Sequence, residues 1–237
     1  MADIIEGQND CDCALYNNSQ DFDIILKFGE HKIYAHKVVL RMWSPFFSNT
    51  FKSRFAVATN PVFLLDDQDD DFEAVSAMVK HMYDMSYGKH PLDRGGLELK
   101  DDHIPYWEQA IYHQLAVYTA ADKYDCPAVR RAALERMNIY LGITASPTLD
   151  PPAVVRKLSF FIPLISKICG PDAPKLADQS LYTDTVKFCV RWHPRLIYHA
   201  EYRTAFQKKA LYDTTSHEKM YEAHITYLEG KQGINRL

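Results

Sequence analysis

The sequence predicts an α+β domain with a small mixed sheet flanked by about five helices, followed by an all-helical extension. Three observations support this prediction. Two apolar runs flank a Gly-Glu turn within residues 23–35, the apolar spacing changes from that of a strand to that of a helix at His36, and helical spacing recurs after residue 153. The 237 residues, of which 47% are hydrophobic and 24% charged, can bury a core of this size.

The predicted sheet begins with a hairpin. Residues 23–28 form an apolar run, Gly29-Glu30 supplies a two-residue turn, and residues 32–35 form the returning strand. Because the first run is too apolar for an exposed strand, we expect it at the centre of the sheet. Residues 61–65 predict a third strand, which starts at a proline where no N–H donor is needed. Residues 1–20 are polar and predict a flexible arm.

Helices are predicted on both sides of the third strand. Helical spacing starts at His36, and a second helix begins with Ser44 as its N-cap and Pro45 at its first position. The acidic run of residues 66–71 precedes apolar residues at helical spacing, so its carboxylates should cap a helix. A calcium loop does not fit this run, because Phe72 stands where such a loop requires glycine.

The rest of the domain is predicted to be a loop and two helices. Residues 86–108 contain several glycines and prolines and predict a long surface loop. Residues 111–124 carry so wide an apolar surface that their helix must be packed on two sides. Residues 125–127 start another helix, which stops at Gly142. The domain is therefore predicted to span residues 21–142.

The C-terminal part is predicted to be a separate helical region. Residues 143–152 are rich in turn formers and predict a linker. Residues 153–237 predict three or four helices, and the expected breaks are at Gly170-Pro171, Pro174 and Pro194. We expect this extension to pack on the first domain.

Charge and hydropathy exclude several classes of partner. The formal net charge is -4, so the chain has no general attraction for nucleic acid or for an anionic membrane. No apolar run approaches the roughly 20 residues that cross a bilayer, and the N-terminus lacks the features of a secretory signal. We therefore expect a location in the cytoplasm, the nucleus or both.

The cysteines do not predict a disulfide framework or a metal site. They are odd in number and scattered, which favours reduced thiols. Their positions are Cys11, Cys13, Cys126, Cys169 and Cys189. The closest pair has no second cysteine pair or suitably spaced histidine pair to complete a zinc site. We expect no metal and no cofactor.

Four short elements together resemble one known family. They are Asp23-Ile24-Ile25-Leu26, the stretch of residues 33–40 with Ala35-His36-Lys37 at its centre, Ser44-Pro45-Phe46-Phe47, and Leu115-Ala116 leading to Ala121-Asp122-Lys123-Tyr124. In this order and at these distances they resemble the BTB (POZ) family over about residues 20–142. The chain looks most like the short BTB proteins that are abundant in fungi.

This resemblance implies a BTB/POZ fold that is used for self-association and for recruiting other proteins. Many relatives are homodimers, and a subset are substrate adaptors for cullin-type ubiquitin ligases. The likeness would place Asp23 and Lys37 near the dimer groove and would make His36 a residue that supports the fold. Cullin-binding relatives usually carry a hydrophobic-x-acidic element after the second helix, whereas residues 51–58 contain no acidic residue. The likeness to cullin adaptors is therefore weaker than the likeness in fold.

Two groups of residues are candidates for the interaction site. Asp23 and Lys37 form either a charged groove or an ordinary surface ion pair. Five large apolar residues lie within thirteen positions and exceed what one face of a small core easily buries, so part of the set should form a subunit interface. They are Trp43, Phe46, Phe47, Phe51 and Phe55. The alternative is that all five belong to the core.

An enzyme and a DNA-binding regulator are the competing classes. No G-x-S-x-G element surrounds the serines of residues 44–53, and the nine glycines form no phosphate-binding loop, so we expect no catalytic residues. Arg130, Arg131 and Arg136 form the densest basic face, but three charges on one helix are ordinarily solvated. A role in transcription or chromatin would therefore be indirect. The sequence predicts a non-enzymatic, self-associating adaptor or scaffold.

Overall fold

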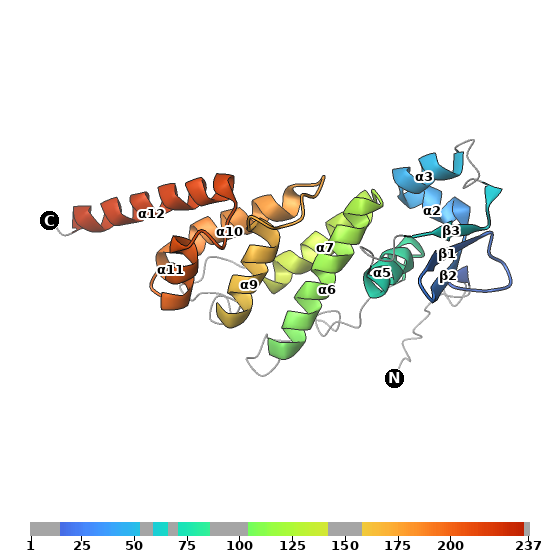
Figure 1. Cartoon of the computed structure of the whole chain (residues 1–237), viewed down its shortest axis with the longest axis horizontal. Coiled ribbons are helices and arrows are strands. Elements are labelled where there is room, and N and C mark those ends of the chain that lie inside the picture. The colour runs from blue at the N-terminus through green and yellow to red at the C-terminus, as the bar shows by residue number, and fades with distance from the viewer. Residues whose placement is uncertain (1–14, 53–58, 66–70, 86–103, 142–157, 235–237) are drawn as a thin grey trace, which may run out of the picture. The chain divides into compact units, whose positions relative to one another are not determined.

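The computed structural model forms two compact units (Figure 1), and the division between them falls within α6 and within α7. The units are Met1–Glu98 with Gln109–Ala133, and Leu99–Glu108 with Leu134–Leu237. The residues that the structure describes are 15–52, 59–65, 71–85, 104–141 and 158–234.

The first unit holds the predicted sheet and the helices around it. Its strands are β1 (Ile24–Phe28), β2 (His31–Ala35) and β3 (Val62–Leu64). Its helices are α2 (Lys37–Trp43), α3 (Pro45–Lys52) and α5 (Phe72–Met82). It also includes α6 (Ile104–Lys123) from Gln109 onward and α7 (Pro127–Tyr140) up to Ala133.

The sheet confirms the hairpin and the central position of its first strand. Its order is β2-β1-β3, with β1 antiparallel to β2 and parallel to β3, so the sheet is mixed. Leu26 lies opposite Ile33 on one side and opposite Phe63 on the other, and all three are buried. Ile24 and Phe28 are buried as well, since alternate residues of a strand share a face. This face is the sheet's contribution to the core.

The outer edge of β2 is covered by residues that precede β1. The Asn17 N–H donates to the Tyr34 carbonyl (3.1 Å), and the Tyr34 N–H donates to Asn17 Oδ1 (3.0 Å). The Tyr16 hydroxyl forms a hydrogen bond with Ser76 Oγ on α5 (2.9 Å). Both residues belong to the predicted flexible arm, so the last part of that arm is attached to the sheet and to α5. Residues 1–14 lie outside the described residues.

Two of the predicted helix caps are confirmed. Ser44 Oγ accepts the Phe47 N–H at 3.0 Å and so caps α3. Asp71 Oδ1 accepts the N–H groups of Glu73 (2.9 Å) and Ala74 (3.5 Å) at the start of α5. The rest of the acidic run, including the other aspartates weighed for a calcium loop, lies outside the described residues.

The predicted loop of residues 86–108 was wrong at its C-terminal end. Residues 104–108 form the start of α6, while residues 86–103 lie outside the described residues. A proline near a helix start removes no hydrogen bond, because the first four N–H groups have no partner in the helix, and this explains why Pro105 is tolerated. The break between α6 and α7 is confirmed, and Asp125 takes a positive φ of 45° there.

The second unit holds the helical extension. Its helices among the described residues 158–234 are α9 (Leu158–Cys169), α10 (Ser180–Leu196), α11 (Ala200–Gln207) and α12 (Thr214–Ile234). Helix α10 packs against α9 and α12, and α11 packs against α9. Helix α10 continues through Pro194, which lies in its last turn, and the break expected at this proline follows at residues 197–199. The predicted linker of residues 143–152 lies outside the described residues.

Candidate interaction surface

The predicted aromatic set is mainly an internal cluster of the first unit. Phe47 has no exposed surface, and its ring stacks on Tyr124 (5.6 Å between ring centroids) and on Phe51 (5.7 Å). Phe46 and Phe51 are half-buried, and each contacts Phe63 of β3 edge to face. The structure therefore brings these residues together around Phe63 and Tyr124, and Phe47 has no surface to offer a partner.

The two other members of the set lie apart from this cluster. Trp43 is half-buried at the end of α2 and contacts the His81 ring of α5 (6.0 Å). Phe55 lies outside the described residues. Trp43, Phe46 and Phe51 thus retain partly exposed surface, and their part in a subunit interface stays a prediction.

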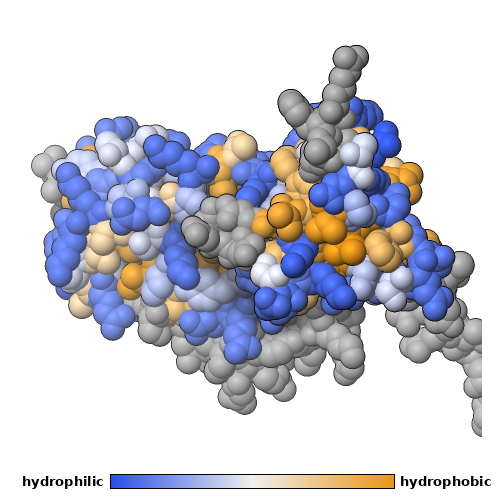
Figure 2. Space-filling view, turned by 45° about the vertical axis from the view of Figure 1, so that its right-hand side comes forward, coloured by the Kyte–Doolittle hydropathy of each residue, from blue (hydrophilic) through white to orange (hydrophobic). Residues whose placement is uncertain are grey.

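The outer face of α2 carries two large exposed apolar side chains. Val38 and Met42 are four residues apart, and 61% and 78% of their surfaces are exposed. Leu40 points to the opposite side and is fully buried. Leu64 of β3 is 72% exposed. Figure 2 shows hydrophobic residues gathered in one area of the face that it draws, with hydrophilic residues around them.

In the sequence, Val38 and Met42 indicated helical spacing, and neither was assigned to an interface. A usable signal was present, because five of the seven residues of α2 are apolar. A short helix packed on one side cannot bury that many large side chains. Val38 and Met42 therefore belong with Trp43, on the same helix, among the residues expected at an interface.

Asp23 contacts Lys37 through the backbone of α2. Asp23 Oδ1 accepts the Lys37 N–H at 2.6 Å. The N-cap residue His36 makes no side-chain capping bond, so Asp23, the residue just before β1, supplies the cap. The Lys37 ammonium lies 5.6 Å from the centre of the Phe51 ring. The structure thus brings both predicted residues together at the start of α2, and their role in a charged groove stays a prediction.

His36 joins the strand-to-helix junction to α5. The Tyr83 hydroxyl accepts the His36 N–H (2.8 Å) and lies 2.8 Å from His36 Nδ1. Burial raises the pKa of Tyr83 to about 12, so this hydroxyl stays neutral and can donate to Nδ1. These contacts are those of a residue that supports the fold. The resemblance implied this role for His36.

The described histidine, cysteine and acidic side chains form no metal-binding cluster. Among them no group of three or more His, Cys, Asp or Glu side chains could hold a metal ion. Cys126, Cys169 and Cys189 are free and buried, and burial raises the pKa of Cys126 and Cys189 to about 12, which keeps these thiols neutral. Cys11 and Cys13 lie outside this part of the chain. Across the described helices, no segment is both long and apolar enough to span a bilayer.

The family comparison agrees with the fold. Residues 14–91 match the family model described as the BTB/POZ domain. The fold is that of a BTB/POZ domain. This is a protein-interaction family, whose domains mediate self-association and the binding of other proteins. The matched range ends before α6, so the Leu115–Tyr124 element that contributed to the resemblance lies beyond it. A comparison with curated proteins found no match.

Proposed function

We propose that the protein is a non-enzymatic adaptor of the cytoplasm or nucleus that forms a homodimer through the outer face of α2 and recruits another protein. The observation that carries the proposal is the exposure of Val38 and Met42. Apolar side chains of this size at the surface of a BTB/POZ domain are typical of the core of an interface between subunits. The partly exposed aromatic residues Trp43, Phe46 and Phe51 extend the apolar area available to a second copy.

The way α2 is anchored supports this assignment. The cap from Asp23, the buried Leu40 and the contact of Trp43 with His81 fix the rotation of α2 about its axis. Val38 and Met42 therefore face outward as a defined surface. A preformed surface of this kind loses little side-chain or backbone entropy when a partner binds.

The oligomeric state tests the proposal directly. Light scattering at micromolar concentration should give about twice the chain mass of 27.4 kDa. The double substitution Val38→Asp/Met42→Asp should yield a monomer with an unchanged circular dichroism spectrum, because buried unpaired carboxylates are costly at an interface. A matched control is Thr204→Asp on the exposed side of α11, which should remain dimeric.

Two outcomes would contradict the proposal. A wild-type protein that stays monomeric at these concentrations would remove the dimer. A folded Val38→Asp/Met42→Asp protein that remains dimeric would place the interface elsewhere. Phe47→Asp cannot serve for this purpose, because Phe47 is fully buried and the substitution would unfold the unit.

A second experiment distinguishes a ubiquitin ligase adaptor from a scaffold. Capture of the tagged protein from its native cells followed by blotting for cullin would assign a ligase adaptor role if cullin is recovered. Recovery of the dimer without cullin would favour a scaffold, in keeping with the missing acidic residue in residues 51–58. An indirect role in transcription or chromatin would instead be indicated by a nuclear partner of those classes.

A further inference from the structure

The helix α12 is attached firmly at its N-terminus. Asp213 Oδ1 accepts the N–H of Ser216 (2.8 Å) and its hydroxyl, and also accepts the Tyr182 hydroxyl of α10 (2.9 Å). The Asp213 N–H donates to the Cys169 carbonyl at the end of α9 (2.6 Å). These bonds cap α12 and join its start to two neighbouring helices.

A second set of contacts fixes the rotation of α12 about its axis. His224 Nδ1 lies 3.2 Å from Nε2 of the buried His193 on α10. One heptad earlier on the same side, the His217 ring stacks on Phe206 of α11 (4.9 Å). Met220 is fully buried on the inner side of the helix. The opposite side of α12 is therefore an outward face that belongs to the folded state.

This outward face carries an apolar stripe. Tyr221, Ile225 and Leu228 are four and three residues apart, which places them on one side of the helix. Their surfaces are 54%, 38% and 42% exposed. A stripe of this spacing is how a helix presents itself to another helix that lies along it.

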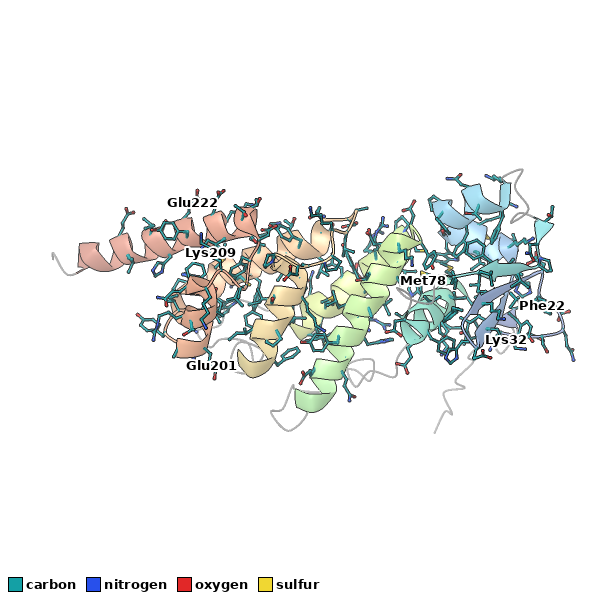
Figure 3. The ribbon with its side chains drawn as sticks, viewed as in Figure 1. Phe22, Lys32, Met78, Glu201, Lys209 and Glu222 are labelled. Carbon is teal, nitrogen blue, oxygen red and sulfur yellow. The ribbon has the colours of Figure 1, made fainter. Side chains whose placement is uncertain are left out.

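One edge of the stripe is acidic. Glu218, Glu222 and Glu229 are four and seven residues apart, so they share a side of α12, and all three are exposed. Figure 3 labels Glu222 on the side of α12 away from α11. The other edge holds the two histidines that face α10 and α11. A partner that lies along the stripe therefore meets carboxylates on one side only.

We propose that the stripe of α12 binds an amphipathic helix of a partner protein whose apolar side is edged by lysine or arginine. Ion pairs with the three glutamates set the orientation of this partner, while Tyr221, Ile225 and Leu228 supply the apolar contact. An antiparallel copy of α12 fits poorly, because residues on the same edge face each other across such a pair and the glutamates would repel. An anionic membrane is disfavoured by the same carboxylates.

Two designed peptides can test this binding site with the full-length protein. Both are fluorescein-labelled helices with the same leucine stripe, and they differ only in having lysines or glutamates along one edge. By fluorescence anisotropy at low salt, the lysine-edged peptide should bind about ten-fold more tightly than the glutamate-edged peptide. The difference should shrink in 1 M salt, where the Debye length is only about 3 Å.

Variants of α12 test whether the preference for the lysine-edged peptide arises at the stripe. Ile225→Ser/Leu228→Ser should weaken binding of the lysine-edged peptide about ten-fold or more, since two apolar contacts are lost. The charge reversal Glu218→Lys/Glu222→Lys/Glu229→Lys should reverse the preference between the two peptides. A matched control makes the same change in net charge at exposed glutamates elsewhere and should leave the preference as it is. The control is Glu73→Lys/Glu108→Lys/Glu135→Lys.

Several results would overturn the proposal. Absence of binding by the lysine-edged peptide, or binding that the serine variant leaves unchanged, would remove the stripe as a site. Reversal by the control triple substitution would attribute the preference to net charge. If, without any peptide, the serine variant formed an assembly of lower mass than the wild type does, the occupant of the stripe would be a second copy of this chain. None of these results depends on the dimer proposed for α2, because that dimer is tested by substitutions on α2.

Discussion

The helices α2 and α12 both direct apolar side chains outward, but the charges beside these side chains have opposite signs. On α2 the neighbouring charged residues are Lys37 and Arg41, whereas on α12 they are Glu218, Glu222 and Glu229. The carboxylates of α12 therefore favour a partner with basic side chains. The net charge of -4 averages over both faces and describes neither.

The two helices also differ in what anchors their inner sides. Helix α2 depends on the Asp23 cap and on apolar packing through Leu40. Helix α12 is held by hydrogen bonds that include the buried His193, whose Nδ1 lies 3.3 Å from the Tyr202 hydroxyl and whose Nε2 lies 3.2 Å from His224 Nδ1. The packing of α2 should therefore be weakened most by truncation of a buried side chain. The packing of α12 should be weakened most by protonation of its buried groups in acid.

The largest expected effect is the loss of packing beneath α2 and α3. Phe47→Ala should lower the free energy of unfolding of the first unit by about 3–5 kcal/mol, because a fully buried aromatic ring leaves a cavity. Urea denaturation monitored by circular dichroism measures this loss. Phe46→Ala, at a half-buried position, should cost less.

The same experiment separates a core role from an interface role for Phe47. If the ring stabilised the protein by contacting a second subunit, the loss would grow or shrink with protein concentration. A loss that is the same across a hundred-fold range of concentration would place Phe47 in the core. A concentration-dependent loss would contradict the packing seen around Tyr124.

Local signals in the sequence were enough to predict much of the first unit. The hairpin depends on a two-residue turn. The caps at Ser44 and Asp71 depend on side chains that accept hydrogen bonds from backbone N–H groups no more than three residues away. Such signals need no information about distant parts of the chain. The burial of Phe47 is different, because it depends on Tyr124, which lies far away in sequence.

The outward faces could not be predicted from periodicity alone. On α12 the inner side contains the fully buried Ser216 and the half-buried His217 and His224, whereas Tyr221 and Ile225 are exposed. Apart from the buried Met220, a hydrophobic pattern assigns these faces the wrong way round, since it expects apolar residues inside. The hydrogen bonds and ring contacts made with α10 and α11 identify which side is buried.

The second expected effect is a loss of stability in acid that is confined to the second unit. Burial, with a smaller contribution from neighbouring His224, lowers the pKa of His193 to about 4 from its ordinary value of 6.5. Below pH 6.5 the unfolded chain binds a proton that the folded chain does not. The free energy of unfolding should therefore fall by up to about 1.4 kcal/mol per pH unit until about pH 4.

The contribution of His193 to this acid sensitivity can be measured separately. Its ring nitrogens face the Tyr202 hydroxyl and His224, and Phe206 packs against its ring. His217, which lies on the same edge of α12 as His224, also has a lowered pKa because of burial and of Lys209. Denaturation of His193→Gln at pH 7, 5.5 and 4.5 should show a shallower pH dependence than the wild type. An unchanged slope would assign the acid sensitivity to other groups.

The third expected effect compares the caps of the two helices. Asp213→Ala should cost about 2–3 kcal/mol, because it removes the acceptor of Ser216 and of the Tyr182 hydroxyl. Asp23→Ala should cost about 1 kcal/mol, because it removes the capping acceptor of the Lys37 N–H. Asparagine at either position keeps an acceptor and should restore part of the loss. Equal costs at the two positions would show that the extra bonds of Asp213 add little.

The smallest expected effects on stability are at the outward faces themselves. Met42→Ser and Ile225→Ser should each change the free energy of unfolding of the isolated chain by less than about 1 kcal/mol, since both side chains are exposed. Denaturation must be done at a concentration below that of dimer formation, because Met42→Ser would otherwise also report the lost interface. A much larger cost for Ile225→Ser under these conditions would mean that the stripe on α12 is covered within the chain. In that case its exposure would no longer support a docking site, while the proposal for α2 would be unaffected.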